Sequence, residues 1–298
     1  MIIVTEQILL LFIFILIGYI FGKTGVIATK ESRVLSTLLV YLLFPCTIFK
    51  AFYTNFNIAN LSNYYPLILA GIVILAVLIL FASVMSKYLG KNDYEKKIYK
   101  YTLIIANFGY MGYTVAEGLY GTEGLLNMIL FAFPFSCFTY TAGYCMLTKS
   151  TISLKRLANP VMIAIILGIV FGLTGIKLPS IAETAVLKSS SCMAPISMIL
   201  AGITISDYQI KELITDKNIY IACAFRLIIL PVTLLLVLKP FAPESIVRCA
   251  VLLNAMPCGL NTIIFPKLIG ENCKTGAKLA FVSNILALAT IPLIISAI

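Results

Sequence analysis

The sequence predicts an all-α membrane protein of ten transmembrane helices, arranged as two inverted repeats of five with broken crossing helices at positions four and nine. Three observations support this fold class: a very apolar composition, an alternation of charge between successive loops, and an internal repeat. The same observations limit the functions that the chain can serve.

The composition is that of a chain lying mostly inside a bilayer. Of 298 residues, 61% are hydrophobic and 11% are charged, and the mean hydropathy is +1.04. A soluble domain carries about 25% charged residues, so most of this chain must face lipid or other apolar helices. The lipid bilayer is therefore a predicted partner. The net charge of +10 is interpreted from its distribution among the loops, and we predict no nucleic-acid partner.

Residue types that support hydrolytic or metal chemistry are scarce. The chain has no histidine, which excludes a Ser-His-Asp triad, a Cys-His pair and the usual zinc ligand. Most of the eight cysteines lie in apolar runs without a CxxC motif, as is typical of buried free thiols. The spans contain no paired carboxylates and no nucleophile–base pair. We therefore predict no enzymatic activity, no cofactor and no metal site.

Ten apolar runs are candidates to cross a membrane, since a span requires roughly 20 residues. The first run has no basic region before Ile8–Ile20 and no clear cleavage site, so we predict a retained span instead of a signal peptide. In chain order, the predicted spans are residues 6–22, 33–53, 64–87, 97–118, 125–147, 159–176, 183–205, 218–238, 246–268 and 276–297.

The loops alternate in charge along the chain. Most lysines and arginines lie in the loops that follow the odd-numbered spans, including the basic run 91–100. The positive-inside rule places these loops in the cytoplasm, so both termini are predicted to lie outside. The short loops and compact length favour the plasma membrane of a bacterium.

Short motifs recur at a constant spacing in the two halves. The segment Gly18-Tyr-Ile-Phe-Gly-Lys-Thr-Gly25 reappears as Gly168-Ile-Val-Phe-Gly-Leu-Thr-Gly175, and Pro45 reappears as Pro195. The predicted repeats are residues 1–148 and 149–298. Because five spans is an odd number, the second repeat enters the membrane from the other side, as in many transporters. The two prolines favour kinks in spans two and seven, with lining of a substrate path as the alternative.

Spans four and nine are each interrupted by an Asn and a Gly five residues apart. One break reads Asn107-Phe-Gly-Tyr-Met-Gly112 and the other Asn254-Ala-Met-Pro-Cys-Gly259. Unwound backbone at membrane depth is tolerated only where it lines a cavity or is buried in protein, and matching breaks in two halves indicate a transporter's binding site. If the breaks cross, two half-helix N-termini converge, and their free amides can bind a carboxylate or phosphate.

Polar side chains near the breaks complete the candidate site. Each break asparagine either satisfies broken backbone or contacts a ligand directly. Arg226, inside span eight, either neutralises a substrate carboxylate or binds carbonyls left free by a break. Asn261 lies two helical turns after Asn254 and extends the same face. The predicted substrate-binding residues are Asn107, Gly109, Tyr110, Gly112, Tyr113, Asn254, Met256, Pro257, Gly259 and Asn261, with Arg226 as a candidate charge partner.

The chain resembles the auxin efflux carrier family, including its bacterial organic-acid permease members, along its whole length. The resemblance lies in the Asn-x-Gly-x-x-Gly break of span four, Met256-Pro257 in span nine, Asn159-Pro160 opening span six, and Arg226 with Pro231 in span eight. It implies a scaffold of spans 1, 2, 6 and 7, a moving transport domain of spans 3–5 and 8–10, a homodimer formed through the scaffold, and elevator-like alternating access.

The resemblance also implies an organic anion bound at the crossing and contacted by Asn107 and Asn254. One position departs from the family, because Tyr113 stands where members often carry proline. Either the first break is softer or Tyr113 enters the site. We expect a secondary carrier of a small organic anion, auxin-like or malate-like. The alternatives are a channel and a membrane-embedded ligand sensor, and uniport and coupling to sodium or protons both stay open.

Overall fold

The computed structural model describes residues 2–28, 31–207 and 209–298, and the named elements in these ranges are all helices. The described helices that are long and apolar enough to cross a membrane are six: Ser32–Asn55, Ile58–Leu89, Phe108–Thr148, Ser180–Ser206, Lys217–Leu238 and Lys274–Ile295. Two shorter apolar helices, Leu9–Thr24 and Pro160–Thr174, accompany them. The all-helical membrane class is confirmed, whereas the inverted repeat of ten spans stays a prediction.

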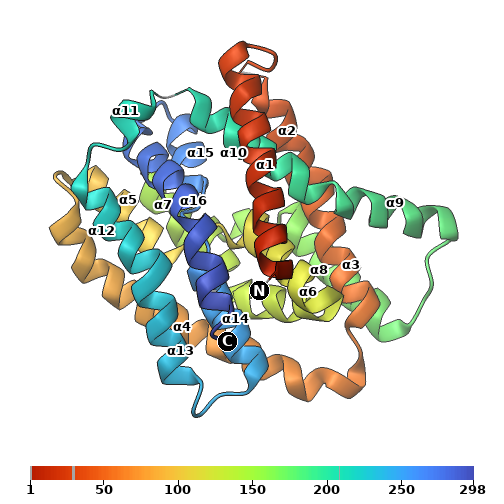
Figure 1. Cartoon of the computed structure of the whole chain (residues 1–298). Helices are drawn as coiled ribbons and strands as arrows, with labels where there is room; N and C mark the ends of the chain where they lie inside the picture. The colour runs from red at the N-terminus through yellow and green to blue at the C-terminus, as the bar shows by residue number, and fades with distance from the viewer. Residues whose placement is uncertain (1, 29–30, 208) are drawn as a thin grey trace.

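The first half of the chain contains helices α1 to α7 (Figure 1). They are α1 (Ile2–Thr24), α2 (Ser32–Leu38), α3 (Phe44–Asn55), α4 (Leu61–Leu89), α5 (Asp93–Ile104), α6 (Tyr113–Phe138) and α7 (Tyr144–Thr148). The connecting turns are the π-helical η1 (Leu39–Leu43), η3 (Phe108–Gly112) and η4 (Thr139–Gly143) and the 3-10 helix η2 (Ile58–Asn60). π-Helical turns are frequent at functional sites, and η3 lies in the first predicted break.

The second half contains helices α8 to α16. They are α8 (Pro160–Thr174), α9 (Ser180–Ser191), α10 (Met193–Ser206), α11 (Ile210–Leu213), α12 (Lys217–Ala224), α13 (Leu230–Leu238), α14 (Glu244–Ala255), α15 (Asn261–Leu268) and α16 (Lys274–Ile295). The 3-10 helix η5 (Leu154–Leu157) precedes α8, and the π-helical η6 (Phe225–Ile229) joins α12 to α13. The predicted span nine is thus α14 and α15, with an interruption between them.

Local sequence fixes several helix ends. The Asn92 side chain accepts a hydrogen bond from the Glu95 amide at 2.9 Å and caps α5, and Asn159 caps α8 in the same way. Gly121 has a φ of 68° and bends α6 into two segments, and Gly270 has a φ of 70° after α15. Residues other than glycine avoid this region. Gly121 and Gly270, which follow the predicted spans four and nine, therefore both have a positive φ.

Glycines of the repeated motif let two pairs of helices pack closely. A Cβ on Gly18 of α1 would collide with the backbone of Ile199 in α10, and a Cβ on Gly168 of α8 would collide with Phe52 in α3. Small residues permit this close approach between membrane helices. The pairs α1–α10 and α3–α8 are thus formed by matching positions of the two halves, as a repeat predicts.

Pro45 and Pro195 each follow an irregular turn. Pro45 is the second residue of α3, directly after the π-helical η1, and Pro195 is the third residue of α10, after the junction at Cys192. Proline lacks an amide donor and is tolerated at the start of a helix. The positions agree with kinks in these helices, and neither proline lines the cavity described below.

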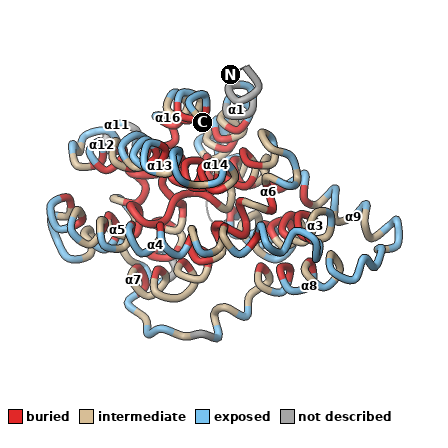
Figure 2. Tube along the Cα trace, turned by 90° about the horizontal axis from the view of Figure 1, so that it is seen from below, coloured by how far each residue is buried: buried red, intermediate tan, exposed pale blue. Residues whose placement is uncertain are grey.

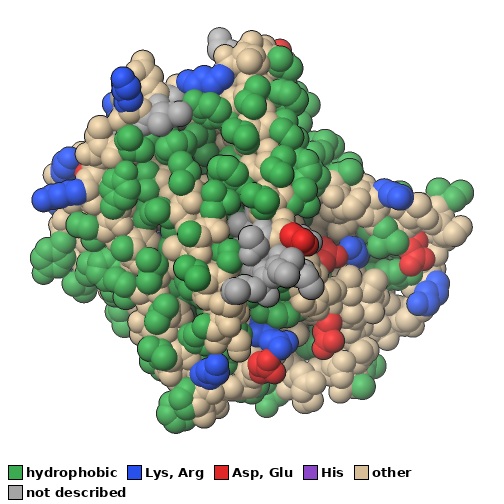
Figure 3. Space-filling model, viewed as in Figure 1, with side chains coloured by type: hydrophobic (Ala, Val, Ile, Leu, Met, Phe, Trp, Pro, Cys, Tyr) green, Lys and Arg blue, Asp and Glu red, His purple; other side chains and the backbone are tan. Residues whose placement is uncertain are grey.

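Burial is greatest at the centre of the molecule, between α5, α6 and α14 (Figure 2). Helix α9 projects from the remainder in both views and packs mainly against α3 (Figures 1 and 2). Hydrophobic side chains cover most of the face seen in Figure 3, and charged ones lie at its edges and in groups right of and below the centre. A surface this apolar suits a protein surrounded by lipid.

Candidate functional site

The two predicted breaks cross each other at the centre of the molecule. Helix α5 ends at Ile104 and α14 ends at Ala255, and extended backbone follows each of them. Ala106 and Cys258 form an antiparallel β-bridge, and the Asn107 amide donates to the Pro257 carbonyl at 2.8 Å. Backbone freed from each helix is thus satisfied by the other, as buried peptide groups require.

Arg226 joins the carbonyl ends of both interrupted helices. Its Nη1 donates to the Leu103 carbonyl at 3.2 Å and to Asn254 Oδ1 at 3.3 Å, and its Nη2 donates to the Leu253 carbonyl at 3.2 Å. The side chain is fully buried. A helix C-terminus carries a partial negative charge, so one guanidinium stabilises two such ends. This geometry favours the carbonyl-binding role over the substrate-neutralising one.

Further hydrogen bonds fix the second break to neighbouring helices. The Cys258 amide donates to Ser283 Oγ of α16 at 3.0 Å. Asn261 Nδ2 donates to the Tyr101 hydroxyl of α5, also at 3.0 Å. Because α15 begins at Asn261, the second half-helix is held against both α16 and α5. The second break is therefore tied to two neighbouring helices, although Arg226 Nε beside it has no hydrogen-bond partner among the described residues.

The first break leaves donor groups free. The Asn107 carbonyl accepts hydrogen bonds from the Met111 and Gly112 amides at 3.1 Å, so the amides of residues 108–110 precede the first intrahelical bond. Such initial amides are the donors that helices present to anions. Asn107 itself is 3% exposed, and its Nδ2 has no hydrogen-bond partner among the described residues. A buried amide without a partner is costly and indicates a place for a ligand or water.

A small cavity of about 50 Å³ lies at the crossing. It is bounded by Phe44 of α3, by both breaks, and by polar residues of α6 and η4. A Cβ on Gly109 would lie 3.0 Å from the Phe44 ring, so glycine at this position allows the ring to close over the break. The cavity lies between α3 and the two crossing segments.

Five of the predicted substrate-binding residues line this cavity. The predicted residues that line it are Asn107, Gly109, Tyr110, Gly259 and Asn261. Those that pack around it without lining it are Gly112, Tyr113, Asn254, Met256 and Pro257. Asn254 does not line the cavity with Asn107, and its side-chain oxygen accepts from Arg226. Arg226 in turn donates to main-chain carbonyls, which is one of the two roles predicted for it.

Tyr113 belongs to an aromatic cluster beside the cavity. Its ring stacks on Phe44 with centroids 5.7 Å apart and meets the edge of Phe108 at 5.9 Å. It is 1% exposed. The residue that replaces the family's proline therefore supports the ring that covers the cavity, and the break in front of it persists as the π-helical η3.

Several lining residues escape sequence reasoning. Phe44, Ser136, Thr139 and Tyr140 come from α3, α6 and η4, outside both breaks. The available signals are weak, since Ser136 and Thr139 are polar residues in an apolar span and Phe44 directly precedes Pro45. Within the described parts of the chain, no group of three or more Cys, Asp or Glu residues is placed to hold a metal ion.

Comparison with known proteins identifies the family of the chain. A family model described as "Membrane transport protein" matches residues 3–155 and 149–295. An uncharacterized transporter, MJ1031, of Methanocaldococcus jannaschii is 26% identical over 305 residues, covering 97% of this chain and 96% of the relative. An uncharacterized transporter of Methanothermobacter thermautotrophicus is 24% identical over 298 residues, with the same coverage. The chain belongs to the membrane transport protein family, the auxin efflux carrier family that its motifs resemble.

Proposed function

We propose that this membrane transporter is a secondary carrier of a small organic anion, which binds where the two broken helices cross. The observation that carries the proposal is the unpartnered Nδ2 of Asn107, buried beside the cavity and next to the first amides of η3. A carboxylate oxygen placed there would accept from the side chain and from the helix start together. Charge-assisted bonds of this kind are about twice as strong as neutral ones.

The rest of the cavity suits an anion without a direct ion pair. Its lining residues are uncharged, and Ser136, Thr139 and Tyr140 supply hydroxyl groups. An acidic side chain in the lining would repel a carboxylate, and none is present among the described lining residues. Helix dipoles and neutral donors bind anions in this way. Such weak, distributed binding also favours release, which a carrier needs as much as capture.

The cavity lies where the implied scaffold meets the implied transport domain. Phe44 comes from α3, whereas the breaks and the polar wall come from the segments expected to move. Two side-chain contacts join α3 to α6 nearby: Lys50 Nζ lies 2.5 Å from Glu117 Oε1, and Thr122 Oγ1 donates to Asn55 Oδ1 at 3.3 Å. Elevator-like movement would break these contacts and carry the cavity away from Phe44. A homodimer in the plasma membrane, with both termini external, belongs to the same proposal.

Binding to Asn107 is tested by thermal-shift titration with a panel of carboxylates, since a ligand specific for the folded state raises its stability. Removing a hydrogen bond to a charged group costs about 1.5–3 kcal/mol. Asn107→Ala should therefore weaken binding by roughly 10- to 100-fold in a protein that still folds. Asn63, which is exposed on α4, provides the control Asn63→Ala. Equal affinity in wild type and Asn107→Ala would remove the crossing as the site.

A further inference from the structure

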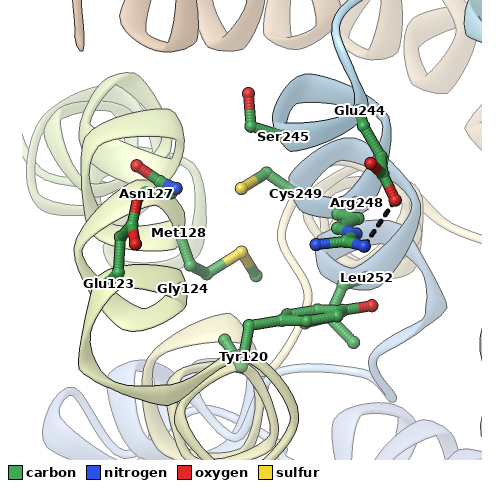
Figure 4. A pocket seen from close by; sticks show the side chains of 11 residues that line it. Tyr120, Glu123, Gly124, Asn127, Met128, Glu244, Ser245, Arg248, Cys249 and Leu252 are labelled. Carbon is green, nitrogen blue, oxygen red and sulfur yellow. Dashed lines mark hydrogen bonds and ion pairs between the residues drawn. The ribbon is translucent and has the colours of Figure 1, made fainter. Parts of the chain in front are cut away.

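A second cavity, of about 280 Å³, lies between α6 and α14 and shares no lining residue with the cavity at the crossing (Figure 4). One wall is α6 on both sides of the Gly121 bend, and the other is the first three turns of α14. Glu123 and Asn127 of α6 are four positions apart, as are Glu244 and Arg248 of α14, so each pair lies on one helix face. By the predicted topology this cavity opens on the external side.

On the α14 wall, the positive charge of Arg248 is compensated by neighbouring side chains. Arg248 pairs with Glu244 one turn earlier, and its guanidinium lies 4.8 Å from the centroid of the Tyr120 ring. Figure 4 shows the ion pair on this side of the cavity with the ring beneath it. The positive charge of Arg248 is therefore compensated twice, by a carboxylate and by an aromatic face.

The α6 wall carries a charge without compensation. Glu123 and Asn127 lie one turn apart and face the cavity from the side opposite Arg248 (Figure 4). Across residues 2–28, 31–207 and 209–298, no ion pair or hydrogen bond of the Glu123 carboxylate is formed. With Glu244 and Arg248 neutralising each other, the cavity has a net negative charge and would repel an anion.

The floor of the cavity is buried and mostly apolar. Met128 is 0% exposed and Leu252 is 1% exposed. Cys249, 5% exposed, points its Sγ into the space (Figure 4) and has no hydrogen-bond partner among the described residues. A carboxylate at the rim above an apolar floor suits a molecule with a charged head and a short hydrocarbon part.

We propose that the α6–α14 cavity binds the ammonium group of a small amine or amino acid, with Glu123 as its counter-ion. A divalent cation fits poorly, because calcium takes six to eight oxygen ligands and one unpaired carboxylate supplies too few. The volume also exceeds that of a bare ion and approaches the lower end of small-molecule sites, about 300 Å³.

The position of Met128 connects this cavity to the first break. A Cβ placed on Gly112 would lie 3.3 Å from Met128 Cε and 3.3 Å from Met256 Cγ. The Met128 side chain thus lies between the ammonium site and Gly112 of the first break. The two cavities share no lining residue, so the two sites can be tested with separate variants.

Cysteine labelling with reagents of opposite charge tests the proposal. The Cys249 thiolate attacks the sulfenyl sulfur of a methanethiosulfonate, forms a mixed disulfide and releases methanesulfinate. The intrinsic preference between the 2-aminoethyl and 2-sulfonatoethyl reagents is measured on free N-acetylcysteine. At Cys249 the preference for the 2-aminoethyl reagent should be about tenfold greater, because Glu123 attracts that reagent and repels the other. Site-resolved mass spectrometry measures labelling of Cys249 in the intact protein. Glu123→Gln should abolish this preference and Glu183→Gln, outside the cavity, should keep it.

Protection experiments identify the source of the ammonium group. Ethylammonium chloride or L-alanine should slow labelling of Cys249 by neutral methyl methanethiosulfonate, whereas sodium acetate at equal ionic strength should not. Slower labelling in phosphatidylethanolamine than in phosphatidylglycerol nanodiscs, without added amine, would assign the group to a lipid headgroup. Equal charge preference at Cys249 and at free N-acetylcysteine, a preference that survives Glu123→Gln, or no protection in any arm would overturn the proposal.

Discussion

Arg226, Asn254 and Asn107 are all buried at the crossing, yet their surroundings differ. Arg226 and Asn254 bond to each other and to main-chain carbonyls, whereas Asn107 keeps an unpartnered amide group beside the cavity. Similar asparagines in the two breaks therefore have unequal roles: one completes the fold and one is available to a ligand. The difference follows from Arg226, which approaches only one of the two.

Arg226→Ala should destabilise the protein instead of changing its substrate preference. The change leaves the Leu103 and Leu253 carbonyls without their donor, at roughly 1–3 kcal/mol for each buried group. Thermal unfolding and size-exclusion profiles in detergent measure the effect, with exposed Arg33→Ala as the control. A stable Arg226→Ala protein with an altered anion preference would instead identify Arg226 as the charge partner of the substrate.

Asn254→Ala distinguishes the structural role of Asn254 from the ligand-binding role proposed for Asn107. Arg226 loses its side-chain acceptor, so we expect a loss of stability of about 1.5–3 kcal/mol, with little change in affinity in the fraction that stays folded. Asn107→Ala should show the reverse pattern. Parallel thermal unfolding and ligand titration of the two variants give the comparison. If Asn254→Ala loses affinity at unchanged stability, both asparagines contact the ligand.

At the scale of helices, the contacts between α3 and α6 decide how the cavity opens. Lys50 and Glu117 form a partly buried ion pair, and Asn55 and Thr122 form a second link further along the same two helices. Both links connect the implied scaffold to the implied transport domain at the end that is predicted to be external. They would stabilise the arrangement in which Phe44 covers the cavity.

Reversing the Lys50–Glu117 pair tests this link. Lys50→Glu or Glu117→Lys alone places like charges together and should shift the equilibrium between transport states, changing the uptake rate by up to about fivefold for a pair worth about 1 kcal/mol. The double reversal restores opposite charges and should recover the wild-type rate. Reversal of the exposed Asp93–Lys96 pair is the matched control. Failure of the double variant to recover would show that the two residues act separately.

The sequence predicts the interrupted helices well, because their causes are local. Asn107, Gly121 and Pro257 mark positions where an uninterrupted helix is unfavourable, and the structure has a break or bend at each of them. The cavity is harder to predict, since Phe44 and Thr139 reach it from other helices. Their positions depend on packing between segments that are distant in the sequence, and no short motif predicts that packing.

At the scale of the whole molecule, two halves of one chain build a single centre. The glycine contacts of α1 with α10 and of α3 with α8 are equivalent in the two halves, and the breaks from each half satisfy one another. Family membership establishes a membrane transporter. The proposed substrate class and elevator-like movement require that this shared centre binds the substrate and releases it on both sides of the membrane.

Counterflow in proteoliposomes tests this central claim most directly. Vesicles loaded with the carboxylate that gives the largest thermal shift receive the same compound, radiolabelled, outside. We predict saturable uptake that is accelerated by internal substrate in the wild type and in Asn63→Ala, and lost in folded Asn107→Ala. Ligand binding without counterflow, unitary currents across a bilayer, or full counterflow in Asn107→Ala would contradict an anion carrier with its site at the crossing.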